Sequence, residues 1–163
     1  MTDTDHTRPE PADERDLLVE RIIHAPRSAV WAAWTDPTTL GQWWVPAPAV
    51  CRVVELELRP GGSFRSEFSE DGVDFVPQIT GCVLEVVPEQ RLVWTTALTA
   101  GWRPAEQPFI SAVIDLADHP DGTRYRATAL HSGVAQRDEH LELGFHAGWG
   151  IVTDQLAALV EQR

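Results

Sequence analysis

The sequence predicts an α+β fold in which a strongly curved, seven-stranded antiparallel sheet grips one long C-terminal helix, with two short helices after the first strand. Between Val50 and Ser132, apolar and polar residues alternate, and turn residues interrupt the alternation about every ten residues. From about Ala135 to Gln162 the apolar residues instead recur at helical spacing. A β-branched segment and two helix-start signals precede both regions, which gives the order of the elements.

The N-terminal part of the fold is a strand followed by two short helices. The strand spans Leu17–Ile23, which is apolar and β-branched, and Pro26 closes it. Pro26 also suits the first helical position, and apolar residues after it recur at three-to-four spacing, so a first helix is expected there. Asp36-Pro37 repeats the start signal and predicts a second helix, which extends to Trp43 or Trp44.

The middle of the chain reads as an antiparallel meander. Its tight turns are predicted at Pro60-Gly61-Gly62, Asp71-Gly72 and Asp121-Gly122. Pro77 and Gly81 predict a bend or bulge inside the longest strand, because proline removes a ladder donor and glycine weakens a strand interior. The six predicted strands lie at 50–59, 64–69, 73–87, 90–98, 109–117 and 123–132.

The segment 99–108, TAGWRPAEQP, has the composition of a loop and carries one large aromatic residue, Trp102. One interpretation is a mobile lid. The other is a surface loop whose tryptophan packs back onto the domain. The sequence leaves both open.

The C-terminal region predicts one continuous helix from about Ala135 to Gln162. Gly144, Gly148 and Gly150 lie inside it, and each costs about 1 kcal/mol relative to alanine in a helix interior. Either the helix backbone presses closely on the sheet at these glycines, or the missing side chains leave space for something else. For Gly148 we expect the close approach. The core-facing stripe consists of Leu141, Phe145, Trp149, Val152, Leu156 and Leu159.

The length of 163 residues suits one domain, which we place at 17–163. Residues 1–16 are rich in Asp, Glu and Pro, so we expect an acidic, disordered tail there. No apolar segment is long enough to span a membrane and the N-terminus has no signal-peptide pattern, so the expected location is cytoplasmic, with no membrane partner.

Charge and residue usage exclude several classes of function. The formal net charge is −12, and all 13 basic residues are arginines scattered among more numerous carboxylates, so no nucleic-acid partner is expected. The absence of lysine excludes Schiff-base chemistry and a P-loop. Cys51 and Cys82 form no CxxC pair, and the six histidines form no HxxxH or HxH, so we expect two free thiols, no metal site and no cofactor.

Short phrases along the chain resemble a known family. They are AP-x-x-x-VW with a following TDP at 25–37, QWWVP at 42–46, LRPGGSF at 58–64, EVVPEQRLVW at 85–94, DGT at 121–123 and HAGW at 146–149. In this order they resemble the SRPBCC superfamily, also called START-like or birch-pollen-allergen-like, and within it the family of homologues of the activator of the heat-shock protein 90 ATPase (AHSA-like). The resemblance covers about Leu17 to Leu159, and the Trp102 loop has no counterpart in it.

This resemblance implies a helix-grip fold with a deep cavity between the sheet and the C-terminal helix, which members use for lipids, polyketides, hormones and other apolar molecules. It implies no particular reaction, because members include carriers, cyclases, stress-linked proteins and co-chaperone modules. Function must therefore be argued from the residues of this chain.

Two pairs of residues are candidates for polar chemistry. Glu142 and His146 are spaced i,i+4, so on one helix they would share a flank and could form an acid/base pair, although a surface ion pair explains the spacing equally well. His131 follows the last strand on the same alternation as Tyr125, so if Tyr125 faces the cavity, His131 does too. The alternative for His131 is a histidine satisfied at a strand end.

Seven tryptophans against one tyrosine is the most unusual feature of the composition. Core packing explains most of them. An aromatic cavity wall is the alternative for Trp43 or Trp44, Trp94 and Trp149, which come from the short helices, a strand and the C-terminal helix.

The leading interpretation is a binding protein for a small hydrophobic molecule, with a stress-related role as one option and no more than weak enzymatic activity. One alternative is a polyketide cyclase-like or hydrolase-like enzyme that uses His131, His146 or Glu142 as a general acid or base. The other is a co-chaperone-like interaction module, whose partner would be another protein or a second copy in a weak homodimer. A void of a few hundred Å³ lined by aromatics would favour the binding protein.

Overall fold

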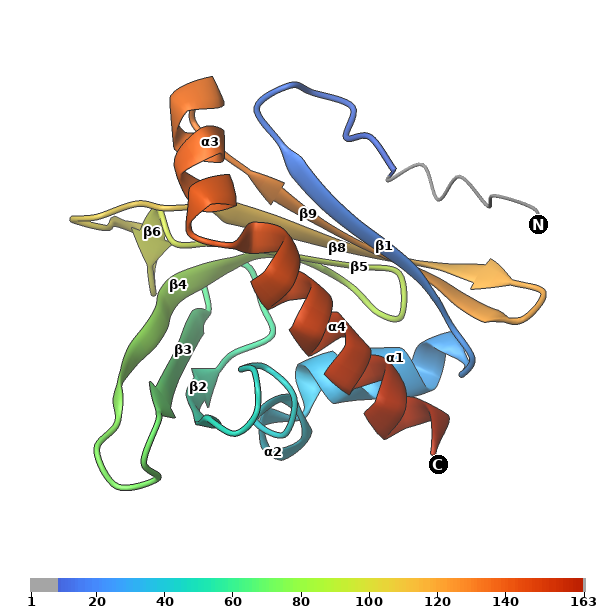
Figure 1. The fold of residues 1–163 in the computed structure, drawn as a ribbon. Helices are drawn as coiled ribbons and strands as arrows, with labels where there is room; N and C mark the ends of the chain where they lie inside the picture. Colours follow the sequence, from blue (N-terminus) through green and yellow to red (C-terminus); the bar gives the residue numbers. More distant parts are fainter. Residues whose placement is uncertain (1–8, 163) are drawn as a thin grey trace.

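The described residues, 9–162 of this computed structural model, form the succession of strands and helices shown in Figure 1. The strands are β1 (Leu17–Ile23), β2 (Val50–Leu56), β3 (Ser63–Ser69), β4 (Val76–Val87), β5 (Arg91–Thr95), β6 (Leu98–Thr99), β7 (Arg103–Pro104), β8 (Ser111–His119) and β9 (Gly122–Leu130). The helices are α1 (Arg27–Thr35), α2 (Pro37–Leu40), α3 (Val134–Glu142) and α4 (Phe145–Glu161).

The main sheet has seven antiparallel strands in the order β1-β9-β8-β5-β4-β3-β2. It curls around α4, which crosses its concave side, while α1 lies beneath the C-terminal half of α4 and α2 lies next to α1 (Figure 1). Leu156 and Ala157 of α4 and Val30 of α1 are fully buried in the core that fills this space. The predicted α+β fold, a curved seven-stranded sheet around a C-terminal helix, is confirmed.

The two short helices follow the predicted signals. The carboxylate of Asp36 accepts a hydrogen bond from the Thr39 backbone N–H at 3.0 Å, which caps α2, and Pro37 occupies its first turn. The helix ends at Leu40, so Trp43 and Trp44 lie in the turn that follows it rather than inside it.

The predicted loop at 99–108 contains a small hairpin, in which β6 pairs with β7. Gly101 and Trp102 both take positive φ angles, of 74° and 65°, in the turn between them. The Trp102 side chain is 52% exposed and its indole lies over Gly61, where an added Cβ would come within 2.8 Å of the ring. Trp102 therefore packs back onto the turn after β2 and does not line the cavity described below.

The first eight residues of the predicted disordered tail lie outside the described residues. In the described part, Asp13 and Arg15 form an ion pair within a turn, at 2.8 Å. The Glu14 carbonyl accepts a hydrogen bond from Arg137 of α3, and the Arg15 carbonyl accepts one from His131. These contacts hold residues 14 and 15 against the sheet end and α3, and disorder of the whole tail stays a prediction.

The predicted single C-terminal helix is wrong, because the chain breaks it into α3 and α4. Gly144 has a φ of 93°, a left-handed conformation that ends α3 and starts α4 in a new direction. Consequently Leu141 lies on the surface instead of in the core stripe, and Leu143 is 71% exposed. None of the helices in residues 9–162 is long and apolar enough to cross a membrane.

The close approach expected at Gly148 is also wrong. An added Cβ on Gly148 or Gly150 would meet no atom within 4 Å, so both positions face open space. We therefore expect Gly148→Ala and Gly150→Ala each to raise the free energy of unfolding by about 1 kcal/mol, the difference in helix propensity. Urea unfolding of the two variants measures this, and a loss of stability in either would show that alanine does not fit there.

Candidate functional site

A cavity of about 280 Å³ opens between the concave side of the sheet and α4. Strands β4 and β5, the segment after α2, the segment before β8, and both C-terminal helices contribute to its wall. Its lining is predominantly apolar and aromatic, which is the usual character of a small-molecule site. The lining residues are Trp44, Pro46, Gln78, Ile79, Trp94, Phe109, Ile110, His140, Gly148, Trp149 and Val152. We call it the tryptophan cavity.

Three of the predicted wall residues line this cavity together. Trp44 packs edge-on against Trp94, with ring centroids 5.9 Å apart, and against Trp149, at 5.6 Å. Such near-perpendicular aromatic pairs are mutually stabilising beyond the area they bury. Trp44 thus joins a strand residue and a helix residue into one aromatic wall, and the absence of a side chain at Gly148 leaves room beside it.

A glutamine of α4 positions the segment that carries Trp44. The Gln155 amide donates to the carbonyls of Trp43 and Val45, at 3.0 and 2.8 Å, and its oxygen accepts from the Ala47 N–H at 2.8 Å. One side chain therefore satisfies three backbone groups that no regular element pairs. Gln155 could not be predicted from the sequence, because its role depends on contacts with residues more than 100 positions away along the chain.

Trp43 belongs to the core rather than to the cavity wall. It is 1% exposed, and its indole N–H donates to the Ala33 carbonyl at 3.0 Å. Its ring packs between Trp34 and Trp44, with centroid distances of 5.0 and 5.6 Å. Of the alternative Trp43 or Trp44, the structure brings only Trp44 to the tryptophan cavity.

Two indole N–H groups in this wall have no partner among the described residues. The Nε1 atoms of Trp44 and Trp94 are fully buried without a hydrogen bond, whereas the Trp34 N–H donates to the Tyr125 hydroxyl at 3.2 Å. A buried donor without an acceptor costs free energy, about 1–3 kcal/mol. Two of the residues that line the tryptophan cavity thus carry buried indole donors without a hydrogen bond.

Tyr125 and His131 do not share the predicted position in the cavity. Tyr125 is fully buried in the core, where burial raises the pKa of its hydroxyl and Trp34 is its hydrogen-bond partner. His131 follows the end of β9 and lines a neighbouring cavity of about 320 Å³. Neither residue lines the tryptophan cavity, although the predicted alternation continues to His131, since Tyr125, Ala127, Ala129 and His131 are all buried.

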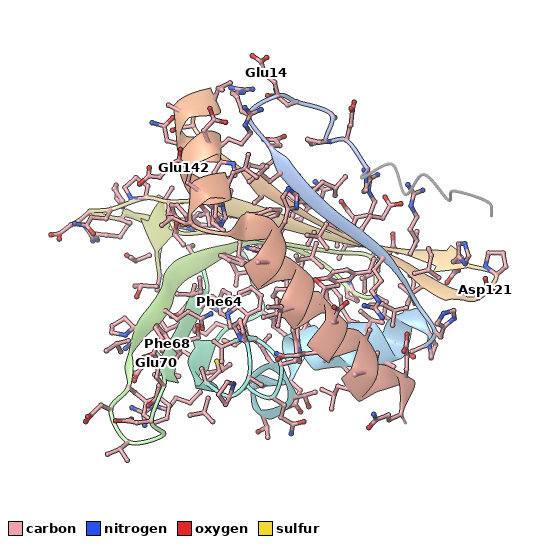
Figure 2. The ribbon with its side chains drawn as sticks, viewed as in Figure 1. Glu14, Phe64, Phe68, Glu70, Asp121 and Glu142 are labelled. Carbon is pink, nitrogen blue, oxygen red and sulfur yellow. The ribbon has the colours of Figure 1, made fainter. Side chains whose placement is uncertain are left out.

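Glu142 and His146 do not share one helix flank as predicted, because they belong to different helices. Glu142 is the last residue of α3 and is exposed, whereas His146 is in the first turn of α4, and Gly144 turns the chain between them. Figure 2 labels Glu142 at the end of α3 and Phe64, a fully buried core residue, on the inner side of the sheet. Neither Glu142 nor His146 lines the tryptophan cavity.

His140 is the polar cavity residue that the sequence analysis missed. It lies on the buried face of α3, is 7% exposed, and hydrogen bonds through Nδ1 to His131 Nε2 at 2.8 Å. Burial lowers the pKa of His140 to about 4, so the ring is neutral near pH 7. The only sequence signal for His140 was its place next to Leu141, the first residue of the predicted apolar stripe.

The thiols offer no nucleophile near the cavity. Cys51 of β2 and Cys82 of β4 are both free, and burial raises the pKa of Cys51 to about 11. A thiol with such a pKa is almost entirely protonated at pH 7, and the thiolate is the reactive form. No group of three or more His, Cys, Asp or Glu side chains within residues 9–162 could hold a metal ion.

The curved sheet, the gripped helix and the cavity between them define a helix-grip protein of the START-like class. The family model described as Activator of Hsp90 ATPase homolog 1-like protein matches residues 24–161. The chain therefore belongs to this family.

Solved structures agree with this assignment. A protein from Nitrosomonas europaea, solved by X-ray crystallography, is 42% identical, with a TM-score of 0.82 and coverage of 91% of this chain and 96% of that one. One from Chromobacterium violaceum is 28% identical, with a TM-score of 0.69 and coverage of 90% and 97%. An AHSA1-like protein from Aeromonas hydrophila, 21% identical with a TM-score of 0.65, covers 90% and 92% and shares the fold. No curated protein matches the chain.

Proposed function

We propose that the protein binds a small, mostly apolar molecule in the tryptophan cavity. The observation that carries the proposal is the aromatic wall of Trp44, Trp94 and Trp149 around a cavity of about 280 Å³. Concave, mainly apolar spaces with a few polar groups are the usual binding sites for small molecules. The polar groups here are Gln78 and His140.

The volume limits the size of the occupant. An engineered protein cavity of about 150 Å³ is known to hold a single benzene ring. The tryptophan cavity, at about 280 Å³, is roughly twice as large, so it has room for a molecule of two fused or linked rings. A long acyl chain would have to extend beyond the lining residues into solvent.

The charge of the chain limits the chemistry of the occupant. A net charge of −12 repels anions, and burial of a charged group in an apolar cavity is costly unless an opposite charge compensates it. No arginine lines the tryptophan cavity to pair with an anion. A neutral ligand therefore fits this site best.

The arrangement of the polar residues favours binding over catalysis. Three of the candidate acid/base residues, Glu142, His146 and His131, lie outside the cavity lining, and His131 is hydrogen-bonded to His140, which does line it. General acid/base catalysis requires a titrating group within hydrogen-bond reach of the reacting atoms. The enzyme alternative therefore rests on His140 alone, which burial keeps neutral near pH 7.

Filling the cavity tests the proposal. The probe is phenylnaphthylamine, a neutral apolar dye that becomes fluorescent in apolar surroundings. Its two fused rings match the volume of the cavity, and its third ring would extend beyond the lining residues. We expect wild type to bind about one equivalent with quenching of tryptophan emission, and Gly148→Leu to weaken binding at least about tenfold because the new side chain enters the cavity.

Gly150→Leu is the matched control, because Gly150 lies in the same helix, also faces open space and does not line the cavity. It should bind the dye as wild type does. Equal weakening in both variants would contradict the proposed location. No binding by folded wild type would contradict the function itself and favour the interaction-module alternative.

A further inference from the structure

A hydrogen-bonded pair of histidines forms part of the wall between two cavities. His131 lines the neighbouring cavity and His140 lines the tryptophan cavity, and Phe109 and Ile110 contribute to both. His131 Nε2 lies 2.8 Å from His140 Nδ1, and His131 Nδ1 lies 2.9 Å from the Arg15 carbonyl oxygen. Both histidine side chains are buried, each with 7% of its surface exposed, and the hydrogen bond between them is buried as well.

The Arg15 carbonyl determines which atom donates in each of these two hydrogen bonds. A carbonyl oxygen only accepts, so His131 must donate from Nδ1. In a neutral His131 the proton is then on Nδ1, and Nε2 can only accept from the Nδ1–H of His140. In neutral His140, therefore, Nε2 carries no proton and presents a lone pair.

The lone pair of His140 Nε2 is not used within the fold. Nε2 makes no hydrogen bond to residues 9–162, while Phe109 and Phe145 pack against the ring at centroid distances of 4.7 and 5.0 Å. In the same part of the chain, the four fully buried side-chain nitrogens without a hydrogen bond belong to Trp44, Arg91, Trp94 and Arg126. His140 Nε2 is not among them, so it keeps accessible surface, and the cavity that His140 lines is the tryptophan cavity.

We propose that His140 Nε2 is the hydrogen-bond acceptor of the tryptophan cavity, and that the ligand is a small neutral aromatic molecule with a hydroxyl group that donates to it. This inference rests on the proposed function. A carboxylate or an ether offers no proton to this lone pair, and an ammonium group would bring an uncompensated charge into an apolar space. A phenol or aromatic alcohol of two rings satisfies the volume, the charge and the polarity of the site together.

His131 acts in this proposal as a positioning residue. It does not line the tryptophan cavity, but its bond to Nδ1 determines which nitrogen of His140 carries the proton. Two carboxylates lie near His131. Asp16 precedes β1, and Glu139 of α3 lines the same neighbouring cavity as His131. A protonated His131 would donate from Nε2 to His140 Nδ1 instead, so the tautomer of His140 distinguishes the two states of the pair.

The test compares naphthol with its methyl ether, which has the same rings but no donor. Isothermal titration calorimetry near pH 7 is expected to show wild type binding naphthol about fivefold more tightly than the ether, the contribution of one net hydrogen bond. His140→Phe keeps an aromatic ring without the acceptor, so the ratio of the two affinities should fall to about one. Retention of the preference in folded His140→Phe would overturn the proposal.

Nitrogen NMR of the wild-type protein provides a second measurement that does not depend on any variant folding. We expect His140 to carry its proton on Nδ1, and the Nε2 resonance to shift when naphthol is added but not when the ether is added. A proton on Nε2 in the free protein would overturn the proposal. In His131→Leu the preference for Nδ1 should be lost, a result that a purely structural role of His131 would not produce.

The binding results distinguish a failure of the His140 inference from a failure of the proposed function. If naphthol and the ether bind wild type equally, the tryptophan cavity binds small aromatic molecules but His140 is not an acceptor for a hydroxyl group. If neither compound binds, the proposed function and the inference are both contradicted.

Discussion

Replacing Trp43 by alanine is expected to lower the free energy of unfolding by about 3–5 kcal/mol, the usual cost of deleting a large buried aromatic side chain. The ring is almost completely buried and packs edge-on against two other indoles. The substitution also leaves the Ala33 carbonyl without its donor. Urea unfolding, followed by far-ultraviolet circular dichroism so that the lost fluorophore does not matter, measures the change.

Trp102→Ala is the matched control, because it removes the same side chain from a half-exposed surface position. We expect a cost of about 1 kcal/mol or less there. Folded Trp43→Ala should still bind phenylnaphthylamine, since Trp43 does not line the tryptophan cavity. Equal costs for the two variants would show that the tryptophans at 34, 43 and 44 do not form a tightly packed core.

The three tight turns of the meander could be predicted from the sequence, because each depends on the residues of the turn itself. Gly61, Gly72 and Gly122 lie in the three predicted turns and all take positive φ angles. At Gly122 a Cβ would lie 2.2 Å from the Ile23 carbonyl, so the close pairing of β1 with β9 also depends on it. Such requirements involve only a few neighbouring residues, and therefore composition and alternation were sufficient to predict them.

The break between α3 and α4 was not predictable in the same way. Gly144, Gly148 and Gly150 look alike in the sequence, yet only Gly144 leaves the helical conformation. The new direction allows His140 to contact His131 and Phe145 to pack into the core. Both contacts join the C-terminal region to the sheet end, so the local sequence around the glycines does not reveal which one bends.

The candidate site was predicted in its aromatic part and missed in its polar part. Helical periodicity indicated that Trp149 is on the buried face of its helix, and the unusual number of tryptophans indicated Trp94 as a candidate wall residue. His140 and Gln155 carry no such pattern. Their roles depend on partners such as His131 and the backbone of 43–47, which only the folded chain brings within hydrogen-bond distance.

Tyr125→Phe is expected to lower the free energy of unfolding by about 1–3 kcal/mol without changing the affinity for phenylnaphthylamine. The hydroxyl accepts the Trp34 N–H in a part of the core that water does not reach. Its removal leaves that indole donor buried without an acceptor, which costs more than the hydrogen bond itself contributes. Because Tyr125 does not line the tryptophan cavity, the binding site should stay intact.

A double-mutant cycle with Trp34→Phe separates this hydrogen bond from general packing. If the bond is the cause, the cost of Tyr125→Phe should be smaller by at least about 0.5 kcal/mol when Trp34 is already phenylalanine, because no indole donor then remains to be orphaned. Strictly additive costs would contradict this account. Unchanged stability together with weaker dye binding would instead mean that Tyr125 contacts the ligand, as its alternation with His131 first suggested.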